Sequence, residues 1–210
     1  MGYSELGTRN PQLISIFPFM NIILIGYRGS GKSEVGRRLS TRLGMKFVDT
    51  DDFIEKHQGT PISEIVQTYG WDHFRTLEKE VISTISDCDQ QVVAAGGGAV
   101  LDPDNVAVMK TRGLIIWLKA DPDTLLKRMQ KDPQTIDRRP SLTGRGSFEE
   151  IEEVLTFRNA FYEEASAAQL DTSKMDIETV VESILTIISL SPCACLRVGG
   201  GEGGGEGGPA

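Results

Sequence analysis

Eight residues, Gly26 to Ser33, constrain this chain more than any other stretch. They read Gly-Tyr-Arg-Gly-Ser-Gly-Lys-Ser and match the phosphate-binding pattern G-x-x-x-x-G-K-[ST] at every fixed position. Glycines in such a stretch allow a tight backbone curl whose N–H groups point inward at anionic oxygens. Lys32 would supply a positive charge for the β- and γ-phosphates of a nucleotide, and the Ser33 hydroxyl would bind Mg²⁺.

The flanking residues decide between a phosphate loop and an ordinary glycine-rich turn. Residues 21–25 form an apolar run of strand length that ends at the first glycine. Beyond the loop, Val35, Leu39 and Leu43 recur four residues apart, which is typical of a helix packed on a sheet. Strand, loop and helix therefore follow in the order that a phosphate site requires, with the positive end of the helix at the phosphates. We interpret the stretch as a nucleotide site.

Composition limits the classes of protein that fit. The chain has 210 residues, of which 39% are hydrophobic and 25% charged, as expected for one globular α/β domain. Its net charge of −8 argues against a nucleic-acid partner. No apolar run approaches the ~20 residues of a membrane span. Cys88, Cys193 and Cys195 make no disulfide framework, and reduced thiols in a cytoplasmic protein are favoured over a metal site at the last two.

The pattern divides the chain into a domain with two appended segments. Residues 1–19 are expected to be an N-terminal extension, either packed beside the first strand or preceding an internal start, because they lack the features of a signal peptide. Residues 20–190 are expected to form the domain. Residues 191–210 are rich in glycine and predicted to be disordered. Within the domain, residues 130–146 lose apolar periodicity and carry Arg138, Arg139 and Arg145, which favours a mobile lid.

Acidic residues follow the second predicted strand. Residues 46–51 are expected to be extended, so that Asp49 and Asp51, separated by Thr50, point to the same side. Two facing carboxylates repel each other unless a cation or a proton lies between them, and Mg²⁺ is the natural candidate beside a phosphate loop. The alternative is a capping cluster for a helix that starts at Asp52, and the two readings are compatible.

Two further features are a run of glycines and a pair of opposite charges. Gly96, Gly97 and Gly98 stop a third strand at residue 95, where parallel sheets bind ligands and where backbone N–H groups approach a small molecule; a tight turn is the alternative. Arg75 and Glu78 fall three residues apart on a predicted helix at residues 71–86, which by itself indicates only a surface ion pair. A separate short helix is expected at residues 61–69.

The predicted elements describe a three-layer α/β fold of the P-loop kinase type, with a five-stranded parallel sheet, flanking helices and a lid. At this level the chain resembles the shikimate kinases. The resemblance covers about residues 21–190, and the motifs that carry it occur in the family's order. They are Gly26–Ser33, Asp49-Thr-Asp51, Phe74-Arg75 with Glu78, Gly96-Gly97-Gly98-Ala99-Val100, Arg139-Pro140-Ser-Leu142, and Arg158 followed by Tyr162.

The resemblance implies specific roles. The chain would use ATP with Mg²⁺ to phosphorylate the 3-hydroxyl of shikimate, acting as a monomer without nucleic acid or membrane. Lys32, Asp51 and Arg139 would be catalytic, Ser33 and Asp49 would hold Mg²⁺ (Asp49 through water), and Arg128 would stack near adenine. The nucleotide would contact Gly29, Ser30, Gly31, Lys32, Ser33, Glu34, Arg128 and Arg139. Shikimate would contact Asp51, Arg75, Gly96, Gly97, Gly98 and Arg158, with the two arginines on its carboxylate.

The chain departs from the family pattern in three ways that bear on the nucleotide. Ser33 stands where many members carry Thr, and Ala95 stands where many members have a hydroxyl residue that bonds near the nucleotide. The region around Lys174 lacks the Arg and Pro that some members place near adenine. Three other kinds of protein remain as rivals: a gluconate or nucleoside-monophosphate kinase, a guanine-nucleotide switch, and a kinase-like binding protein without activity. The chain lacks the N-K-x-D guanine signature of the second, and the third would be expected to have lost residues such as Lys32 or Asp51.

Overall fold

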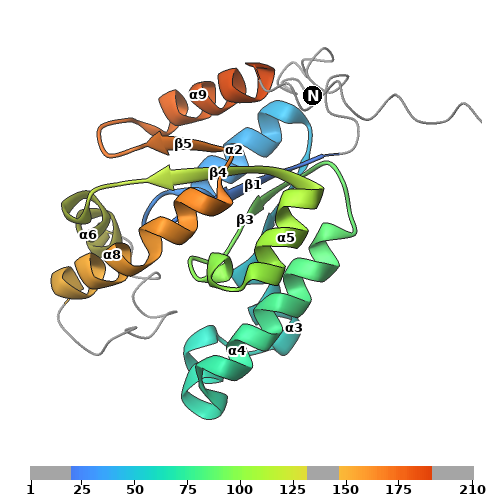
Figure 1. Ribbon diagram of the computed structural model, residues 1–210, viewed down its shortest axis with the longest axis vertical. Coiled ribbons are helices and arrows are strands. Elements are labelled where there is room, and N and C mark those ends of the chain that lie inside the picture. The colour runs from blue at the N-terminus through green and yellow to red at the C-terminus, as the bar shows by residue number, and fades with distance from the viewer. Residues whose placement is uncertain (1–19, 132–146, 191–210) are drawn as a thin grey trace, which may run out of the picture.

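The computed structural model describes residues 20–131 and 147–190, which form a parallel sheet covered by helices on both faces (Figure 1). The predicted extension at residues 1–19, the tail at residues 191–210 and most of the expected lid, Arg139 included, lie outside the described residues. The strands are β1 (Asn21–Ile25), β2 (Lys46–Asp49), β3 (Gln91–Ala94), β4 (Gly113–Lys119) and β5 (Ala168–Asp171). The helices are α2 (Lys32–Leu43), α3 (Thr50–Gln58), α4 (Ile62–Ser86), α5 (Pro103–Arg112), α6 (Pro122–Lys131), α8 (Ser147–Ala165) and α9 (Ile177–Leu190), with a 3-10 turn η1 at Ala99–Leu101.

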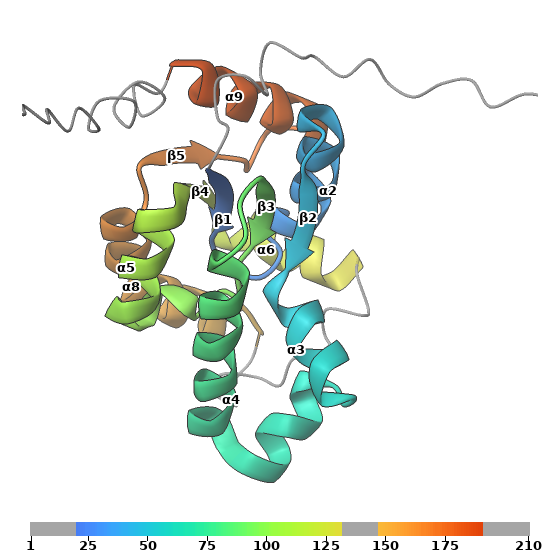
Figure 2. The same ribbon diagram turned by 90° about the vertical axis from the view of Figure 1, so that its right-hand side faces the viewer.

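Strand β1 lies at the centre of the sheet, whose order is β2-β3-β1-β4-β5 with all pairs parallel. Its side chains alternate between two cores, as the period of a strand requires. Ile22 and Leu24 pack with α2 and α9, whereas Ile23 and Ile25 pack with α4, α5 and α8. Figure 2 shows the same separation of helices on the two faces. The three-layer α/β prediction is confirmed.

Parallel strands end at the same edge of the sheet, so the loops after β1, β2 and β3 converge there. These loops hold the glycine-rich stretch, the acidic pair and the three glycines. The register fixes their relative depth, because Asp49 at the end of β2 pairs with Ala94 at the end of β3, and Leu24 of β1 pairs with the same Ala94. The sheet therefore collects the predicted site from segments that are up to about 70 positions apart.

The junction of β2 and α3 differs from the sequence prediction. The strand stops at Asp49 rather than running to Asp51, and α3 starts at Thr50 rather than at Asp52. Asp49 is the N-cap, and its Oδ1 accepts a hydrogen bond from the backbone N–H of Asp51 at 3.1 Å. A carboxylate at this position satisfies a backbone donor of the first helical turn. This hydrogen bond favours starting the helix at Thr50 over continuing the strand to Asp51. The proposed cap at Asp52 and the extended geometry of the pair were both wrong.

Smaller differences concern helix ends. The two helices expected at residues 61–69 and 71–86 form the single element α4, broken at Gly70, where φ is 83° and ψ is 171°. This positive φ suits glycine and allows the kink that separates the two helical segments. Helix α6 continues through Gln130 and Lys131, so the first two residues of the expected lid are helical. None of the helices in the described ranges is both long and apolar enough to cross a membrane.

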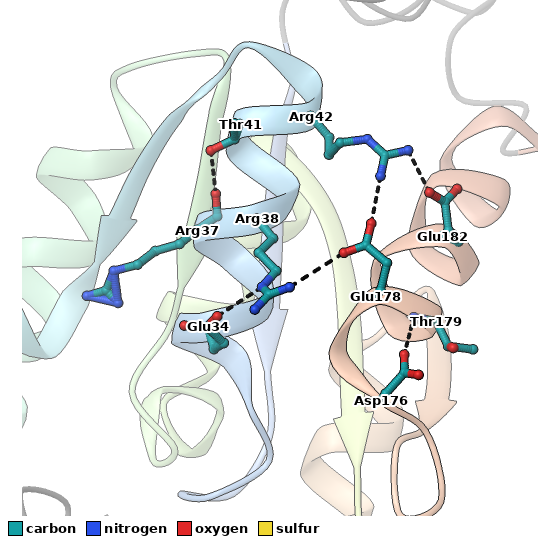
Figure 3. Close-up of polar contacts among 9 residues, drawn as sticks. All are labelled: Glu34, Arg37, Arg38, Thr41, Arg42, Asp176, Glu178, Thr179 and Glu182. Atoms are coloured by element: carbon teal, nitrogen blue, oxygen red, sulfur yellow. Dashed lines mark hydrogen bonds and ion pairs between the residues drawn. The ribbon is translucent and has the colours of Figure 1, made fainter. Parts of the chain in front are cut away.

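Ion pairs join α9 to α2 on the surface (Figure 3). Arg42 donates to Glu178 at 2.8 Å and to Glu182 at 2.6 Å, and Arg38 contacts Glu34 and the same Glu178. All of these side chains are about half exposed. Water therefore screens them, and the buried face of α9 carries most of its attachment.

Replacing Arg42 tests how little this network contributes. We expect Arg42→Met to lower the Tm by only about 1–3 °C, because exposed pairs contribute little and α9 keeps its apolar contacts. In ~0.5 M NaCl the difference from the parent protein should shrink further, since salt screens exposed charges. Thermal unfolding followed by circular dichroism at both salt concentrations measures this. A large drop that salt leaves unchanged would contradict it.

Candidate active site

The phosphate loop connects β1 to α2 at the centre of the sheet edge. Gly26 adopts φ 141°, and a Cβ there would overlap the carbonyl oxygen of Leu118 on the neighbouring strand β4. Only glycine therefore allows the loop to leave the sheet along this path. Lys32, which is 7% exposed, donates from Nζ to the carbonyl oxygens of Gly26 and Tyr27 at 2.9 and 3.1 Å. The Lys32 ammonium group is thus held by two carbonyl oxygens of the phosphate loop itself.

Ser33 and Asp49 lie against each other beside the loop. Ser33 Oγ donates to Asp49 Oδ2 at 2.5 Å, while Asp49 Oδ1 caps α3. Both carboxylate oxygens are therefore oriented, one by the hydroxyl and one by the backbone of Asp51. The structure brings together the two residues that were predicted to hold Mg²⁺, although by capping a helix rather than by alternation along a strand. Asp51 itself is 7% exposed and sits in the first turn of α3.

An ion pair on α4 forms one wall of a second cleft. Arg75 donates from Nη1 to Glu78 Oε2 at 2.5 Å, with the Glu78 side chain 1% and the Arg75 side chain 30% exposed. Sequence alone indicated a surface pair, but the acidic member is fully buried. Burial raises the pKa of Glu78, and the neighbouring positive charge of Arg75 opposes this rise. Arg75 also lies over the rings of Trp71 and Phe74, so aromatic stacking and Glu78 together fix its guanidinium.

Helix α8 forms another wall of this cleft. Arg158 donates from Nη1 to the carbonyl oxygen of Gly97 at 3.1 Å, and Tyr162 Oη donates to the same oxygen at 2.5 Å. Burial raises the pKa of Tyr162 to about 12, so its hydroxyl remains a donor at neutral pH. These two bonds tie α8 to the glycine turn after β3. They hold Arg158 in the lining of the same cleft as Arg75.

The glycine turn forms the floor between these walls. A Cβ on Gly96 would lie 2.6 Å from Glu78 Oε1 and 2.9 Å from Asp51 Oδ1, and a Cβ on Gly98 would overlap the guanidinium of Arg75. The turn therefore lacks side chains because functional groups occupy the space. This observation favours the ligand reading of the three glycines over that of a simple turn.

The two clefts share part of their lining. The cleft along the phosphate loop, lined by Lys32 and Ser33, is named the donor cleft and holds about 1520 Å³ of space open to solvent. The cleft between α4, α8 and the glycine turn is named the acceptor cleft and holds about 460 Å³. Asp51, Ile62 and Arg28 contribute to both. Of the predicted residues, the donor cleft is lined by Gly29, Gly31, Lys32, Ser33, Glu34, Asp49, Asp51 and Arg128, and the acceptor cleft by Asp51, Arg75, Gly96, Gly97, Gly98 and Arg158.

Two predicted nucleotide contacts stand apart from this arrangement. Ser30 is 1% exposed and lies outside the lining of both clefts, and its buried Oγ has no hydrogen-bond partner in the described part of the chain. Arg128 lines the donor cleft, but its guanidinium donates to the Thr172 hydroxyl at 3.1 Å and to the Thr172 carbonyl at 2.6 Å. The threonine in the segment noted as a departure from the family pattern thus holds this arginine.

Sequence reasoning missed several residues that line the clefts. Arg28 occupies a variable position of the phosphate loop, and its Nη2 donates to Glu150 Oε1 at 2.5 Å. Trp71 and Ile62 supply apolar lining in the acceptor cleft. A basic residue inside the loop was the available signal for Arg28, but the motif leaves that position open, and Glu150 is 122 positions away.

A phosphoryl donor and its acceptor must meet, and here a phosphate-loop cleft and an arginine-walled cleft share Asp51. That arrangement on a parallel sheet defines a phosphotransferase of the P-loop kinase fold. Residues 28–189 match the shikimate kinase family model. The chain belongs to the shikimate kinase family.

Individual relatives agree with this assignment. The chain is 40% identical over 173 residues to a shikimate kinase of Syntrophus aciditrophicus, covering 79% of this chain and 89% of that protein. It is 40% identical over 168 residues to shikimate kinase 2 of Yersinia enterocolitica, covering 80% and 95%. Among solved structures, shikimate kinase from Acinetobacter baumannii in complex with shikimate has a TM-score of 0.78 at 29% identity, covering 84% and 97%. Shikimate kinase from Aquifex aeolicus has a TM-score of 0.69 at 30% identity, covering 81% and 96%.

Proposed function

We propose that this chain transfers the γ-phosphoryl group of ATP to the 3-hydroxyl of shikimate. The family match and the relatives named shikimate kinase support the reaction, and one relative was solved with shikimate bound. The observation that carries the proposal is the pair of clefts that meet at Asp51, one built on a phosphate loop and the other walled by two arginines. The acceptor is therefore expected to be a small alcohol that bears a negative charge.

The acceptor cleft suits a carboxylate. Arg75 and Arg158 both line this cleft, from α4 and α8, and a guanidinium offers paired donors that match carboxylate geometry. Each is already held by a protein group, Arg75 by Glu78 and Arg158 by the Gly97 carbonyl. Such fixed donors lower the ordering cost of binding. A carboxylate placed between them would leave the hydroxyls of the ring facing Asp51.

Asp51 and Lys32 would act on the reacting groups. Asp51 would orient the attacking hydroxyl and accept its proton, while Lys32 would exchange its loop carbonyls for the β- and γ-phosphates. A bond forms between the shikimate oxygen and the γ-phosphorus as the bond to the bridging oxygen breaks, and ADP retains that oxygen. Most of the catalysis would come from positioning and charge neutralisation.

The Ser33–Asp49 pair suits Mg²⁺. The described residues hold no cluster of three or more His, Cys, Asp or Glu side chains that would form a metal cage, whereas Mg²⁺ bound to a nucleotide needs one or two protein oxygens beside phosphates and water. Ser33 Oγ and Asp49 Oδ2 are oxygens oriented at the donor cleft and fit this requirement. When bound, the ion would neutralise charge on the β- and γ-phosphates.

Other assignments stay predictions. Arg139, on the transferring phosphoryl group, lies outside the described residues. Glu34 and Arg128 line the donor cleft, where the resemblance places ATP. The monomeric state, the absence of nucleic-acid and membrane partners, the cytoplasmic location and the division at residues 20 and 190 likewise remain predictions.

A substrate panel tests the proposed reaction. We expect ADP release, followed by a coupled enzyme assay, to be at least about a hundredfold faster with shikimate than with gluconate or AMP, because the arginine pair selects a carboxylate on a compact ring. EDTA should reduce the rate to background. The product is checked by phosphorus NMR for a monoester at the 3-oxygen. Faster turnover of gluconate or AMP would reassign the acceptor, and no turnover of any would indicate a binding protein.

A further inference from the structure

Arg28 occupies the boundary between the two clefts. It lines both, together with Asp51 and Ile62. The other basic side chains in the described lining of these clefts belong to one side each: Lys32, Arg37 and Arg128 to the donor cleft, and Arg75 and Arg158 to the acceptor cleft. The positive charge of Arg28 therefore lies where the phosphoryl group must pass from the donor cleft to the acceptor cleft.

The Arg28 backbone is fixed at this boundary by the close approach of the phosphate loop to the glycine turn. A Cβ on Gly97 would lie 3.3 Å from the Gly26 carbonyl oxygen and 3.8 Å from the Arg28 nitrogen. The loop of the donor cleft and the floor of the acceptor cleft are thus in near contact. The pairing of β1 with β3 brings the phosphate loop against the glycine turn, and this contact fixes the position of the Arg28 backbone.

The Arg28 side chain is held from a distant element. Its Nη2 donates to Glu150 Oε1 at 2.5 Å, with side-chain exposures of 15% for Arg28 and 3% for Glu150. Glu150 lies in the first turn of α8, the helix that also carries Arg158. A pair this deeply desolvated contributes little net stability, so stability alone is a poor reason for its presence.

The guanidinium of Arg28 has one buried N–H donor that no described residue accepts. Its Nε is buried and has no hydrogen-bond partner among residues 20–131 and 147–190. A buried donor without a partner costs free energy, and such groups in folded proteins call for a reason such as a ligand that is absent. Phosphate oxygens are the acceptors that a guanidinium fork fits best beside a phosphate loop.

We infer that Arg28 is a further catalytic residue, whose guanidinium contacts the phosphoryl group during its transfer, and that Glu150 is a positioning residue that holds this guanidinium. The inference rests on the proposed function. In a loose transition state, charge spreads over the three equatorial oxygens of the phosphoryl group, and a fixed guanidinium at the boundary stabilises that charge. The same contact would persist on the phosphate of the product.

Arg28→Met and Arg28→Lys separate this role from binding of the shikimate carboxylate. We expect Arg28→Met to lower kcat by about tenfold or more while the KM for shikimate changes by less than about threefold. Arg28→Lys should recover part of kcat, because it restores charge without the fork. In calorimetry, Arg28→Met should weaken binding of shikimate 3-phosphate by about tenfold and leave binding of shikimate unchanged. Lys79→Met is the control, because Lys79 forms exposed ion pairs with Asp102 and Asp104 and lines neither cleft.

Glu150→Gln tests the positioning role. It keeps the shape of the side chain but removes its charge, and we expect a smaller loss of kcat than in Arg28→Met. The double variant should be no worse than Arg28→Met alone, since a group that acts only through Arg28 adds nothing once Arg28 is gone. Losses of kcat that multiply in the double variant would overturn the assignment of Glu150.

Other results overturn the assignment of Arg28. An unchanged kcat in Arg28→Met would do so, and so would a raised KM with unchanged kcat, which would place Arg28 on the substrate carboxylate. If both Arg28 variants lose activity in proportion to a lower Tm, the Arg28–Glu150 ion pair serves folding stability rather than catalysis. The parent protein separates this inference from the proposed function. If it fails to phosphorylate shikimate, the proposed function is wrong; if it is active and Arg28→Met is equally active, only the inference is wrong.

Discussion

Asp51→Asn is expected to lower kcat with shikimate by about a hundredfold to ten-thousandfold, the range associated with losing a positioned general base. Asp51 is 7% exposed and lines both clefts, so its carboxylate faces the place where acceptor and donor meet. Asparagine keeps the size of the side chain and the helical turn but removes the proton acceptor. Steady-state rates of ADP release with both substrates saturating measure the loss.

The design of this test separates chemistry from folding. Asp49, rather than Asp51, caps α3, so the helix start should survive the substitution. We expect the Tm to change by less than about 3 °C, because the substitution removes no buried apolar group. Asp104→Asn, a change at a carboxylate that is 72% exposed on α5, should leave kcat unaltered. A kcat for Asp51→Asn within about threefold of the parent would reject a role in the chemical step.

The elements that could be predicted are those that local pattern determines. Strand β1 has the expected bounds, and Val35, Leu39 and Leu43 form the buried face of α2 as predicted, since each element has apolar residues with one period and ends at a glycine. Convergence of the motifs at one sheet edge also followed from sequence, because parallel strands separated by helices must end together. The donor cleft is therefore mostly visible in the chain itself.

The features that the sequence left undetermined depend on competition between two possible N-cap residues or on contacts between residues far apart in the chain. Asp49 and Asp52 are both good caps, and only the packed structure shows that Asp49 holds that place, which shifts Asp51 into a helical turn. The Arg75–Glu78 spacing is the same on an exposed or a buried helix face. Burial of Glu78 comes from the glycine turn packed against it, 18 positions or more along the chain. Arg28 and Glu150 have no local signal that would join them.

Gly98→Ala is expected to raise the KM for shikimate by about a hundredfold, the loss of two charge-assisted hydrogen bonds of about 1.5 kcal/mol each. The backbone at Gly98 has φ −107° and ψ −1°, which alanine adopts without strain. The added methyl would nevertheless overlap the guanidinium of Arg75. A long side chain moves more easily than a packed turn, so Arg75 should swing out and the cleft should lose one carboxylate donor.

Displacing Arg75 also leaves Glu78 buried without its partner. The pKa of Glu78 is raised by burial and held down by Arg75, so it should rise further in Gly98→Ala. A carboxyl whose pKa is higher in the folded than in the unfolded state favours folding below its unfolded pKa, and this contribution is lost as pH rises through the folded pKa. We therefore expect a Tm that is lower by roughly 5–10 °C at neutral pH, with a deficit that narrows as the pH falls toward the ordinary carboxyl range.

A double-variant cycle makes the Gly98 prediction specific. Arg75→Met should reproduce the rise in KM, and Gly98→Ala combined with Arg75→Met should be no worse than either alone, because the methyl acts only by evicting a side chain that is already absent. Substrate affinity is measured by titration calorimetry as well as by KM, so that a slow chemical step is not mistaken for weak binding. If the two increases in KM multiply, Gly98 contributes through its own backbone contact with the ligand. The explanation that Gly98 leaves room for the Arg75 guanidinium would then be wrong.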